Sequence, residues 1–257
     1  MSDTVLLDIA HGVARVTLNR PDAMNAITVE LGSALRAAIE EAGDRNDVSV
    51  VVVRGACGNF SAGGDFREVE RLRAEGPDAL LPLFANFSAA CAMVADIDQP
   101  VIAAVDGVAM AGGFELMLAA DIVLVHADAR ISDNHINYGQ VPGGGSTQRL
   151  PRLIGRQRAL SHLLTGERLS GRQAVAAGLA LRAFEADDFD PGVEDFVASM
   201  VARRPDALRR IKRLVNDGLA LPLRRGIDLE QQVVVAHIAG DGGRAGVAAF
   251  TEKGAHS

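Results

Sequence analysis

Two glycine-rich stretches in the first half of the chain contain residue types that could stabilise a negatively charged oxygen. They are residues 59–65 (NFSAGGD) and residues 106–115 (DGVAMAGGFE). Small residues let a substrate approach the main chain closely, so both stretches can present bare backbone amides. If the second stretch opens a helix at Gly112, its first N–H groups are unpaired and lie at the positive end of the helix dipole. Each such donor contributes roughly 3 to 4 kcal/mol to a transition state that develops negative charge.

These glycines also have a purely structural interpretation, because glycine is common in tight turns and close helix contacts. The presence of two such stretches, each ending in a carboxylate (Asp65 or Glu115), favours a functional site. Glu115 would lie on the first turn of a helix, where the dipole favours its ionised form. A plain charge interaction with that helix terminus is the alternative explanation for Glu115.

Nucleotide and metal chemistry are disfavoured. Neither stretch has the pattern GxGxxG, and the chain contains no GxxxxGK[ST] phosphate loop. His and Cys residues are scattered without ligand spacing such as CxxC or HExxH, so we predict neither a metal nor a redox cofactor. Cys57 and Cys91 are expected to be reduced and packed rather than paired.

The elements that must position these stretches alternate between strands and helices. Alternating apolar and polar residues predict a hairpin of residues 5–9 and 13–18. Apolar runs and helical spacing predict buried strands and helices, in the order strand 48–53, helix 77–95, strand 101–105, helix from Gly112 and strand 121–125. This order indicates βαβ units with right-handed crossovers, in which ligands bind near the carboxyl ends of the strands.

One further helix has clear start and stop signals. Thr28 can cap it, and Leu31, Leu35 and Ile39 recur every four residues along one stripe. Gly43 lies where a left-handed stop is expected. From residue 191 onward, Ala, Leu and Arg in helical spacing replace the β-branched runs, apart from residues 233–235. We therefore predict an all-helical appendage that serves packing or assembly.

Composition restricts the classes of protein further. The chain has 257 residues, of which 48% are hydrophobic, enough for one large domain or for one domain plus an appendage. The net charge of −7, the 4% of aromatic residues and the lack of a dense basic run argue against nucleic-acid binding. The first nine residues lack a signal-peptide pattern, and no segment approaches the roughly 20 apolar residues that span a bilayer. We expect a cytoplasmic protein that is not bound to a membrane.

Several motifs, in this order along the chain, resemble those of the enoyl-CoA hydratase/isomerase (crotonase) family. They are LNRP at 18–21 with Asn25 and Ala26, residues 60–65 and 105–115, VPG at 141–143 with TQRL at 147–150, LTG at 164–166, and residues 174–178. The resemblance implies an α/β fold, a spiral of ββα units with a C-terminal helical appendage. Residues 1–190 would form the core with the acyl-CoA site. Residues 191–257 would form a helical oligomerisation region in a homotrimer or a hexamer made of two trimers.

The resemblance also implies roles for individual residues. The backbone N–H groups of Ala62 and Gly112 would form the oxyanion hole for the thioester carbonyl, and Glu115 would be a catalytic carboxylate. Coenzyme A would be part of the substrate, with no separate cofactor, and Phe250 and Lys253 would reach a neighbouring subunit's coenzyme site. The positions implied for binding the substrate and coenzyme A are Arg20, Ala23, Ser61, Ala62, Gly63, Asp65, Gly112, Phe250 and Lys253.

One departure from the family pattern concerns the second catalytic glutamate. Family hydratases usually carry it four residues before the glycine that matches Gly139, and this chain has His135 there. An imidazole transfers protons near neutral pH, so His135 could replace that acid or base. It could equally be a hydrogen-bonded residue of the pocket wall with no proton-transfer role.

Some β-diketone hydrolases of the family resemble this chain in having a histidine at this place. They pair it with an aspartate nine residues later, where this chain has Gly144. Asp133 is close in sequence to His135, but residues two apart need not meet in space.

Three functions therefore remain open at the level of sequence. The first is an enoyl-CoA hydratase or isomerase, of which an isomerase needs only Glu115. The second is a carbon–carbon bond hydrolase that uses His135. The third is a catalytically silent acyl-CoA-binding protein. A serine peptidase is disfavoured, because Ser61 and Ser146 lie outside any GxSxG elbow.

Overall fold

The computed structural model describes residues 3–240 and residue 243. The chain divides into two compact units, residues 1–201 and residues 202–257. The first unit is a mixed α/β structure with a six-stranded and a three-stranded sheet. The expected α/β architecture is therefore confirmed.

The larger sheet is mostly parallel. Its strands lie in the order β1 (Val5–Ala10), β2 (Val13–Leu18), β3 (Val50–Gly55), β4 (Val101–Val105), β6 (Ile122–His126) and β9 (Arg182–Phe184). Strands β1 and β2 form the predicted antiparallel hairpin, and every later pair is parallel. His11 and Gly12 connect β1 to β2, and both have positive φ, as a two-residue hairpin turn of the primed type requires.

The smaller sheet explains how the chain winds as a spiral. It contains β5 (Val108–Met110), β7 (Arg130–Ser132) and β8 (Leu169–Ser170). The chain passes from β4 in the larger sheet to β5 in the smaller one and then into helix α4 (Gly112–Ala119). It repeats this path through β6, β7 and helix α5 (Ser146–Ile154). Each repeat is a ββα unit, and in each unit the segment after the second strand carries residues that line the candidate site.

Helix α1 (Val29–Gly43) begins as its sequence predicts and ends for a different reason. The Thr28 side chain accepts a 3.0 Å hydrogen bond from the Leu31 N–H, and the predicted apolar stripe is fully buried. The expected left-handed stop at Gly43 is wrong, because Gly43 is the last helical residue and Asp44 is right-handed. A side chain at Gly43 would lie 2.4 Å from Ile97, so close packing accounts for this glycine.

Helices α2 (Phe66–Glu75) and α3 (Pro77–Asp96) follow the first glycine-rich stretch. Among the described residues, α3 is the one helix that is long and apolar enough to cross a membrane, which corrects the expectation that no segment has this composition. Its inner face, which includes Phe87, Cys91 and Val94, is buried, and α3 packs against α1, α2 and α4. We therefore assign α3 to the first unit, where it packs through one face.

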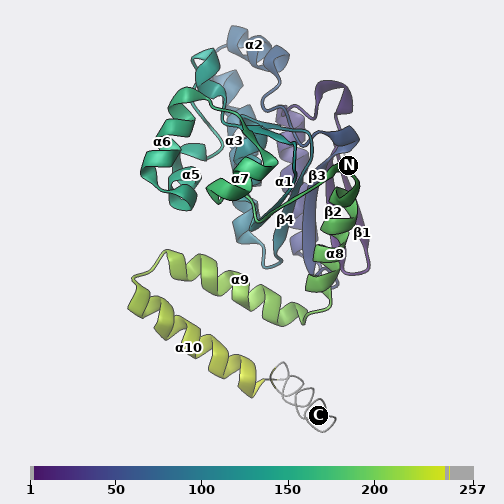
Figure 1. The fold of residues 1–257 in the computed structure, drawn as a ribbon, viewed down its shortest axis with the longest axis vertical. Coiled ribbons are helices and arrows are strands. Elements are labelled where there is room, and N and C mark those ends of the chain that lie inside the picture. The colour runs from purple at the N-terminus through teal and green to yellow at the C-terminus, as the bar shows by residue number, and fades with distance from the viewer. Residues whose placement is uncertain (1–2, 241–242, 244–257) are drawn as a thin grey trace. The chain divides into compact units, whose positions relative to one another are not determined.

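The remaining helices complete the two units. Helices α6 (Arg156–Thr165), α7 (Gly171–Ala177) and α8 (Phe189–Val201) belong to the first unit, and α8 packs on β3, β6 and β9. In the second unit, α9 (Pro205–Leu219) and α10 (Leu223–Ala239) form an antiparallel pair (Figure 1). The β-branched residues 233–235 lie within α10. Phe250 and Lys253 lie outside the described residues.

Candidate active site

The two glycine-rich turns lie side by side. Ser61 and Ala109 form a parallel bridge, in which the Ser61 N–H donates to the Val108 carbonyl over 2.8 Å. Gly63 has φ +95°, and a methyl group added to it would lie 2.7 Å from the Ala111 side chain and 3.2 Å from the Gly112 nitrogen. Only a glycine at this position allows the turns to approach so closely. The convergence that a two-amide site requires is therefore present.

The hydrogen bonds of these turns determine which amides are free. The Ala62 N–H donates to the Met24 carbonyl over 2.9 Å, so the amide expected to serve the oxyanion hole is already engaged. Gly64 pairs with Ile27 in a parallel bridge that uses the Gly63 carbonyl and the Asp65 N–H.

The N–H of Gly64 therefore takes no part in this bridge. Within residues 3–240, no hydrogen-bond acceptor is found for the N–H of Gly64 or of Gly112. Both glycines line the same cavity. The free donors are thus Gly64 and Gly112. Ala62 is corrected as a donor, because its N–H is bonded to the Met24 carbonyl, whereas the bridge to Ile27 uses the Gly63 carbonyl and the Asp65 N–H and leaves the Gly64 N–H on the other side.

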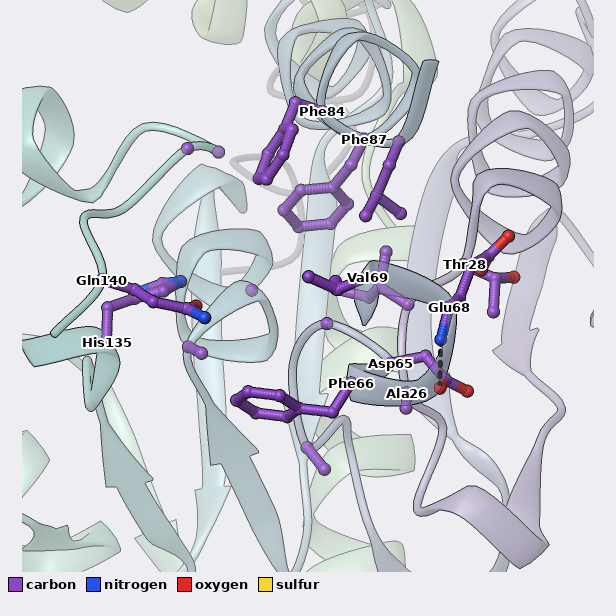
Figure 2. A pocket seen from close by; sticks show the side chains of 18 of the residues that line it. Ala26, Thr28, Asp65, Phe66, Glu68, Val69, Phe84, Phe87, His135 and Gln140 are labelled. Carbon is purple, nitrogen blue, oxygen red and sulfur yellow. Dashed lines mark hydrogen bonds between the residues drawn. The ribbon is translucent and has the colours of Figure 1, made fainter. Parts of the chain in front are cut away.

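The cavity beside these amides has a volume of about 1250 Å³ and lies between α2, α3, the start of α4 and the segment around η3 (His135–Tyr138). Figure 2 shows His135 and Gln140 on one wall, with Phe66 and Val69 of α2 across from them and Phe84 and Phe87 of α3 above. The Phe66 ring meets Tyr138 edge to face at 5.3 Å between centroids. This part of the cavity is therefore apolar and suits a hydrocarbon chain.

Glu115 is a buried carboxylate on the first turn of α4, and it lines the cavity. Its Oε1 accepts hydrogen bonds from the Gly144 N–H over 2.7 Å and from the Ser146 N–H over 3.1 Å. Burial raises the pKa of Glu115 above its ordinary value, although the two hydrogen bonds and the charge of His135 oppose this shift. The expected stabilisation of the ionised form by the helix terminus is therefore outweighed by desolvation.

His135 has an orienting carboxylate. Its Nδ1 lies 2.6 Å from Oδ1 of Asp133, a residue with only 1% of its surface exposed. The two residues do meet in space, and the same Asp133 oxygen lies 3.4 Å from the backbone nitrogen of His135 at the start of η3. Burial alone would lower the pKa of His135, but the hydrogen bond and charge of Asp133, with the charge of Glu115, raise it.

Gly144 has a structural role where the family hydrolases carry an aspartate. Its N–H holds Glu115, and a side chain here would lie 2.4 Å from the Phe87 ring and 2.9 Å from Glu115 Oε2. There is no room for a second carboxylate at residue 144. The carboxylate that orients His135 therefore lies two residues before it, at residue 133, and not nine residues after it.

Comparison with known proteins identifies the family of this chain. Residues 8–257 match the family model for enoyl-CoA hydratase/isomerase. The chain belongs to the enoyl-CoA hydratase/isomerase family. It is 34% identical to YngF of Bacillus subtilis over 98% of this chain and 97% of that protein. It is 32% identical to the 2,3-dehydroadipyl-CoA hydratase of Escherichia coli over 94% of this chain and 92% of that enzyme.

Solved structures of the family also superpose on the chain. An enoyl-CoA hydratase from Bacillus anthracis matches with a TM-score of 0.91 at 29% identity, over 97% of this chain and 96% of the other. AtuE from Pseudomonas aeruginosa matches with a TM-score of 0.92 at 30% identity, over 97% of each chain. The crotonase-like spiral expected from the motifs is therefore confirmed.

Arg20 and Asp65, which the family resemblance assigned to coenzyme A binding, stabilise the first glycine-rich turn. Arg20 donates to the Ala26 carbonyl and to Asp65 Oδ2, the latter over 2.9 Å. Asp65 also caps α2 by accepting from the N–H groups of Arg67 and Glu68. Burial would raise the pKa of Asp65, but Arg20 and these backbone donors lower it. Both residues line the cavity, as does Ala23.

The two serines considered for a peptidase do not have that role. Ser61 is fully buried, and its hydroxyl donates to the Asn25 carbonyl over 2.8 Å and accepts from the Gly63 N–H. Ser146 is also fully buried, and its N–H serves Glu115. Neither hydroxyl is hydrogen-bonded to a histidine anywhere in the described chain. Ser61 therefore shapes the first turn instead of contacting a substrate.

Gly64, Asp133 and Gly144 are functional candidates that the motifs did not supply. Gly64 and Ala62 belong to the same glycine-rich stretch, and the direction of each backbone N–H, which distinguishes them as donors, is not visible in the sequence. The DxH spacing of Asp133 and His135 is the sequence signal that points to this pair. Across residues 3–240, no group of three His, Cys, Asp or Glu side chains could hold a metal ion.

Proposed function

We propose that this protein acts on acyl-CoA thioesters as a hydratase or isomerase through an enolate held by the N–H groups of Gly64 and Gly112. Glu115 and His135 are the groups that move protons. One observation carries the proposal: two amides from adjacent turns, for which residues 3–240 supply no acceptor, line one cavity with a buried carboxylate whose second oxygen accepts no hydrogen bond from these residues. Amides directed at the position where charge develops stabilise an enolate oxygen more than the neutral carbonyl.

Hydration of an α,β-unsaturated thioester would use these groups in turn. The water oxygen attacks the β-carbon while Glu115, as a carboxylate, takes one of its protons. The electron pair of the double bond moves onto the thioester oxygen, between the two amides. Collapse of the enolate and transfer of a proton to the α-carbon give the 3-hydroxyacyl thioester. Double-bond isomerisation would need only Glu115, which would remove a proton at one carbon and return it at another.

Binding of coenzyme A requires cations, because its phosphates are strongly anionic. Arg20 lines the cavity and is paired with Asp65. Arg67 and Arg71 of α2 also line it and are more exposed, and Arg71 is paired with Glu75 on the surface of α2. We propose that these arginines, with Ala23, receive the coenzyme. Phe250 and Lys253 would join it from a neighbouring subunit of a trimer or hexamer. No separate cofactor is required, and a cytoplasmic location fits this substrate.

The test is turnover of crotonyl-CoA by the purified full chain, followed as loss of the conjugated enoyl absorbance. Hydration or isomerisation that is lost in Glu115→Gln, with coenzyme-A binding retained, supports the proposal. Binding of acyl-CoA thioesters across a range of chain lengths without turnover would overturn it in favour of the silent binding protein.

A second candidate is the carbon–carbon bond hydrolase, which the Asp133–His135 pair specifically favours. In that reaction, His135 would accept a proton from water, and the water oxygen would attack a ketone carbon. The bond from that carbon to the carbon between the two ketones would break, its electron pair would form the enolate of the second ketone, and the proton held by His135 would return to the enolate carbon. A β-diketone assayed beside crotonyl-CoA separates the two. Crotonyl-CoA turnover that is lost in Glu115→Gln but retained in His135→Ala would eliminate the hydrolase.

A further inference from the structure

Asp133 and His135 form a pair whose geometry leaves one ring nitrogen for the cavity. Nδ1 of His135 faces Asp133 at 2.6 Å, and the His135 side chain is one of the walls of the cavity (Figure 2). An imidazole with Nδ1 bound to a carboxylate presents Nε2 to its other side. The exposed fraction of the His135 side chain is 14%, so little bulk water screens the pair.

The backbone of Asp133 is held in place by a contact with helix α6. Its backbone N–H donates to Nε2 of His162 on α6 over 3.3 Å, and the ring of His162 packs on Phe114. Burial lowers the pKa of His162, which favours the neutral ring that can accept this hydrogen bond. The Asp133 carboxylate thus has a fixed backbone and one strong side-chain partner, His135.

We propose that Asp133 is a positioning residue that keeps His135 as an imidazolium with its Nε2–H directed into the cavity, so that His135 donates the proton to the α-carbon while Glu115 activates water. This inference rests on the proposed function and assigns roles within it. The histidine occupies the place of the family's second glutamate, and the aspartate supplies the negative charge that a histidine needs to remain an acid at neutral pH.

The proton balance of the reaction follows from this assignment. His135 begins protonated and ends neutral after its Nε2 proton passes to the α-carbon. Glu115 begins as a carboxylate and ends protonated after it accepts a proton from water. Transfer of that proton back to His135, directly or through solvent, restores both groups. The hydrolase alternative requires the opposite starting state, because a histidine that accepts a proton from water must begin neutral.

The charged groups around His135 favour its protonated form, which can act as an acid, over its neutral form, which can act as a base. The two groups that set its charge are both carboxylates, Asp133 on its own segment and Glu115 on α4. His162 on α6 contacts the backbone of Asp133, and burial lowers its pKa, which favours the neutral ring. Across the cavity, the charged residues of α2 are of mixed sign and comprise Arg67, Glu68 and Arg71.

The first experiment is a double-mutant cycle in the full chain, with kcat and KM for crotonyl-CoA measured from acid to alkaline pH. In Asp133→Asn we expect kcat near pH 8 to fall about 10-fold or more, with KM nearly unchanged and the alkaline limb of the profile moved to lower pH. In the His135→Gln background the same change should alter kcat by no more than about 2-fold, because Asp133 acts through His135. An equal loss in both backgrounds, or an unmoved limb, would overturn the inference.

The second experiment does not depend on turnover. NMR titration of the unmodified chain follows the His135 ring, which is assigned by the signal that disappears in His135→Gln. We expect the imidazolium to persist above the ordinary range for histidine. Titration in or below that range would overturn the role of Asp133. If the protein does not turn over crotonyl-CoA, the proposed function fails, and the titration still decides whether the pair exists.

Discussion

The Gly144 N–H donates a 2.7 Å hydrogen bond to Oε1 of Glu115, and the space that a Gly144 side chain would need is filled by Phe87 and by the other oxygen of Glu115. One glycine thus both orients the buried carboxylate and fixes how close the wall of the cavity lies to it.

Gly144→Ala should therefore destabilise the protein and reduce turnover together. The added methyl group would lie 2.4 Å from the Phe87 ring, and overpacking of this kind costs about 1 to 3 kcal/mol. Chemical denaturation and kcat for crotonyl-CoA are the measurements. The matched control is Gly218→Ala in α9, where no heavy atom lies within 4 Å of the new methyl group. It should stabilise its helix by up to about 1 kcal/mol. Unchanged stability and kcat in Gly144→Ala would contradict the packing described here.

Gly64→Pro should remove one donor of the oxyanion hole, because proline has no N–H. Loss of such a donor costs about 10² to 10³ in kcat. Gly64→Ala keeps the N–H, and its methyl group would meet no atom closer than 4.0 Å, so we expect a change of only about 3-fold or less. Both variants need a thermal melt, so that unfolding is not mistaken for loss of the donor. Equal activity of the two variants would exclude the Gly64 amide from the site.

Glu115→Gln should lower kcat by about 10² to 10⁴, because the base is lost while the amide oxygen can still accept from Gly144. In the unmodified protein, the raised pKa of Glu115 places the acid limb of the rate profile above the ordinary range for glutamate, and activity falls as pH drops through it. The same raised pKa costs native stability once the carboxyl ionises, above its unfolded pKa. Glu115→Gln should therefore gain stability relative to the unmodified protein as pH rises, which denaturation at pH 4 and pH 8 would reveal. A difference that does not change with pH would refute the raised pKa.

Asp65→Ala should destabilise α2, because it removes the helix cap and the partner of Arg20 together. Loss of an N-cap side chain costs about 0.5 to 2 kcal/mol, and Asp65→Asn, which can still cap, should lose less. The pKa of Asp65 is lowered in the folded protein, so its stabilisation is present above the unfolded pKa and lost as pH falls through the folded value. The difference between the unmodified protein and Asp65→Ala should therefore shrink in acid. Denaturation curves at pH 7 and pH 3 measure it.

The fold could be predicted from the sequence, and so could several of the residues that line the cavity. Alternating and continuous apolar runs placed the hairpin and the buried strands, since burial of one or both strand faces leaves that pattern. The ordered motifs identified the family, and Glu115 and His135 do line the same cavity.

Which backbone amides and side chains are available at the site depends on the tertiary structure. The direction of a backbone amide depends on hydrogen bonds to distant residues, so the bond from Ala62 to Met24 moved the predicted donor to Gly64. The proton state of Glu115 depends on how deeply α4 is buried, which outweighed the helix dipole visible in the sequence. The partner of His135 depends on the local backbone conformation after β7, in which Asp133 lies 2.6 Å from the ring. The first two properties depend on contacts between segments that are distant in the chain, and the third depends on a backbone conformation that residue spacing alone does not specify.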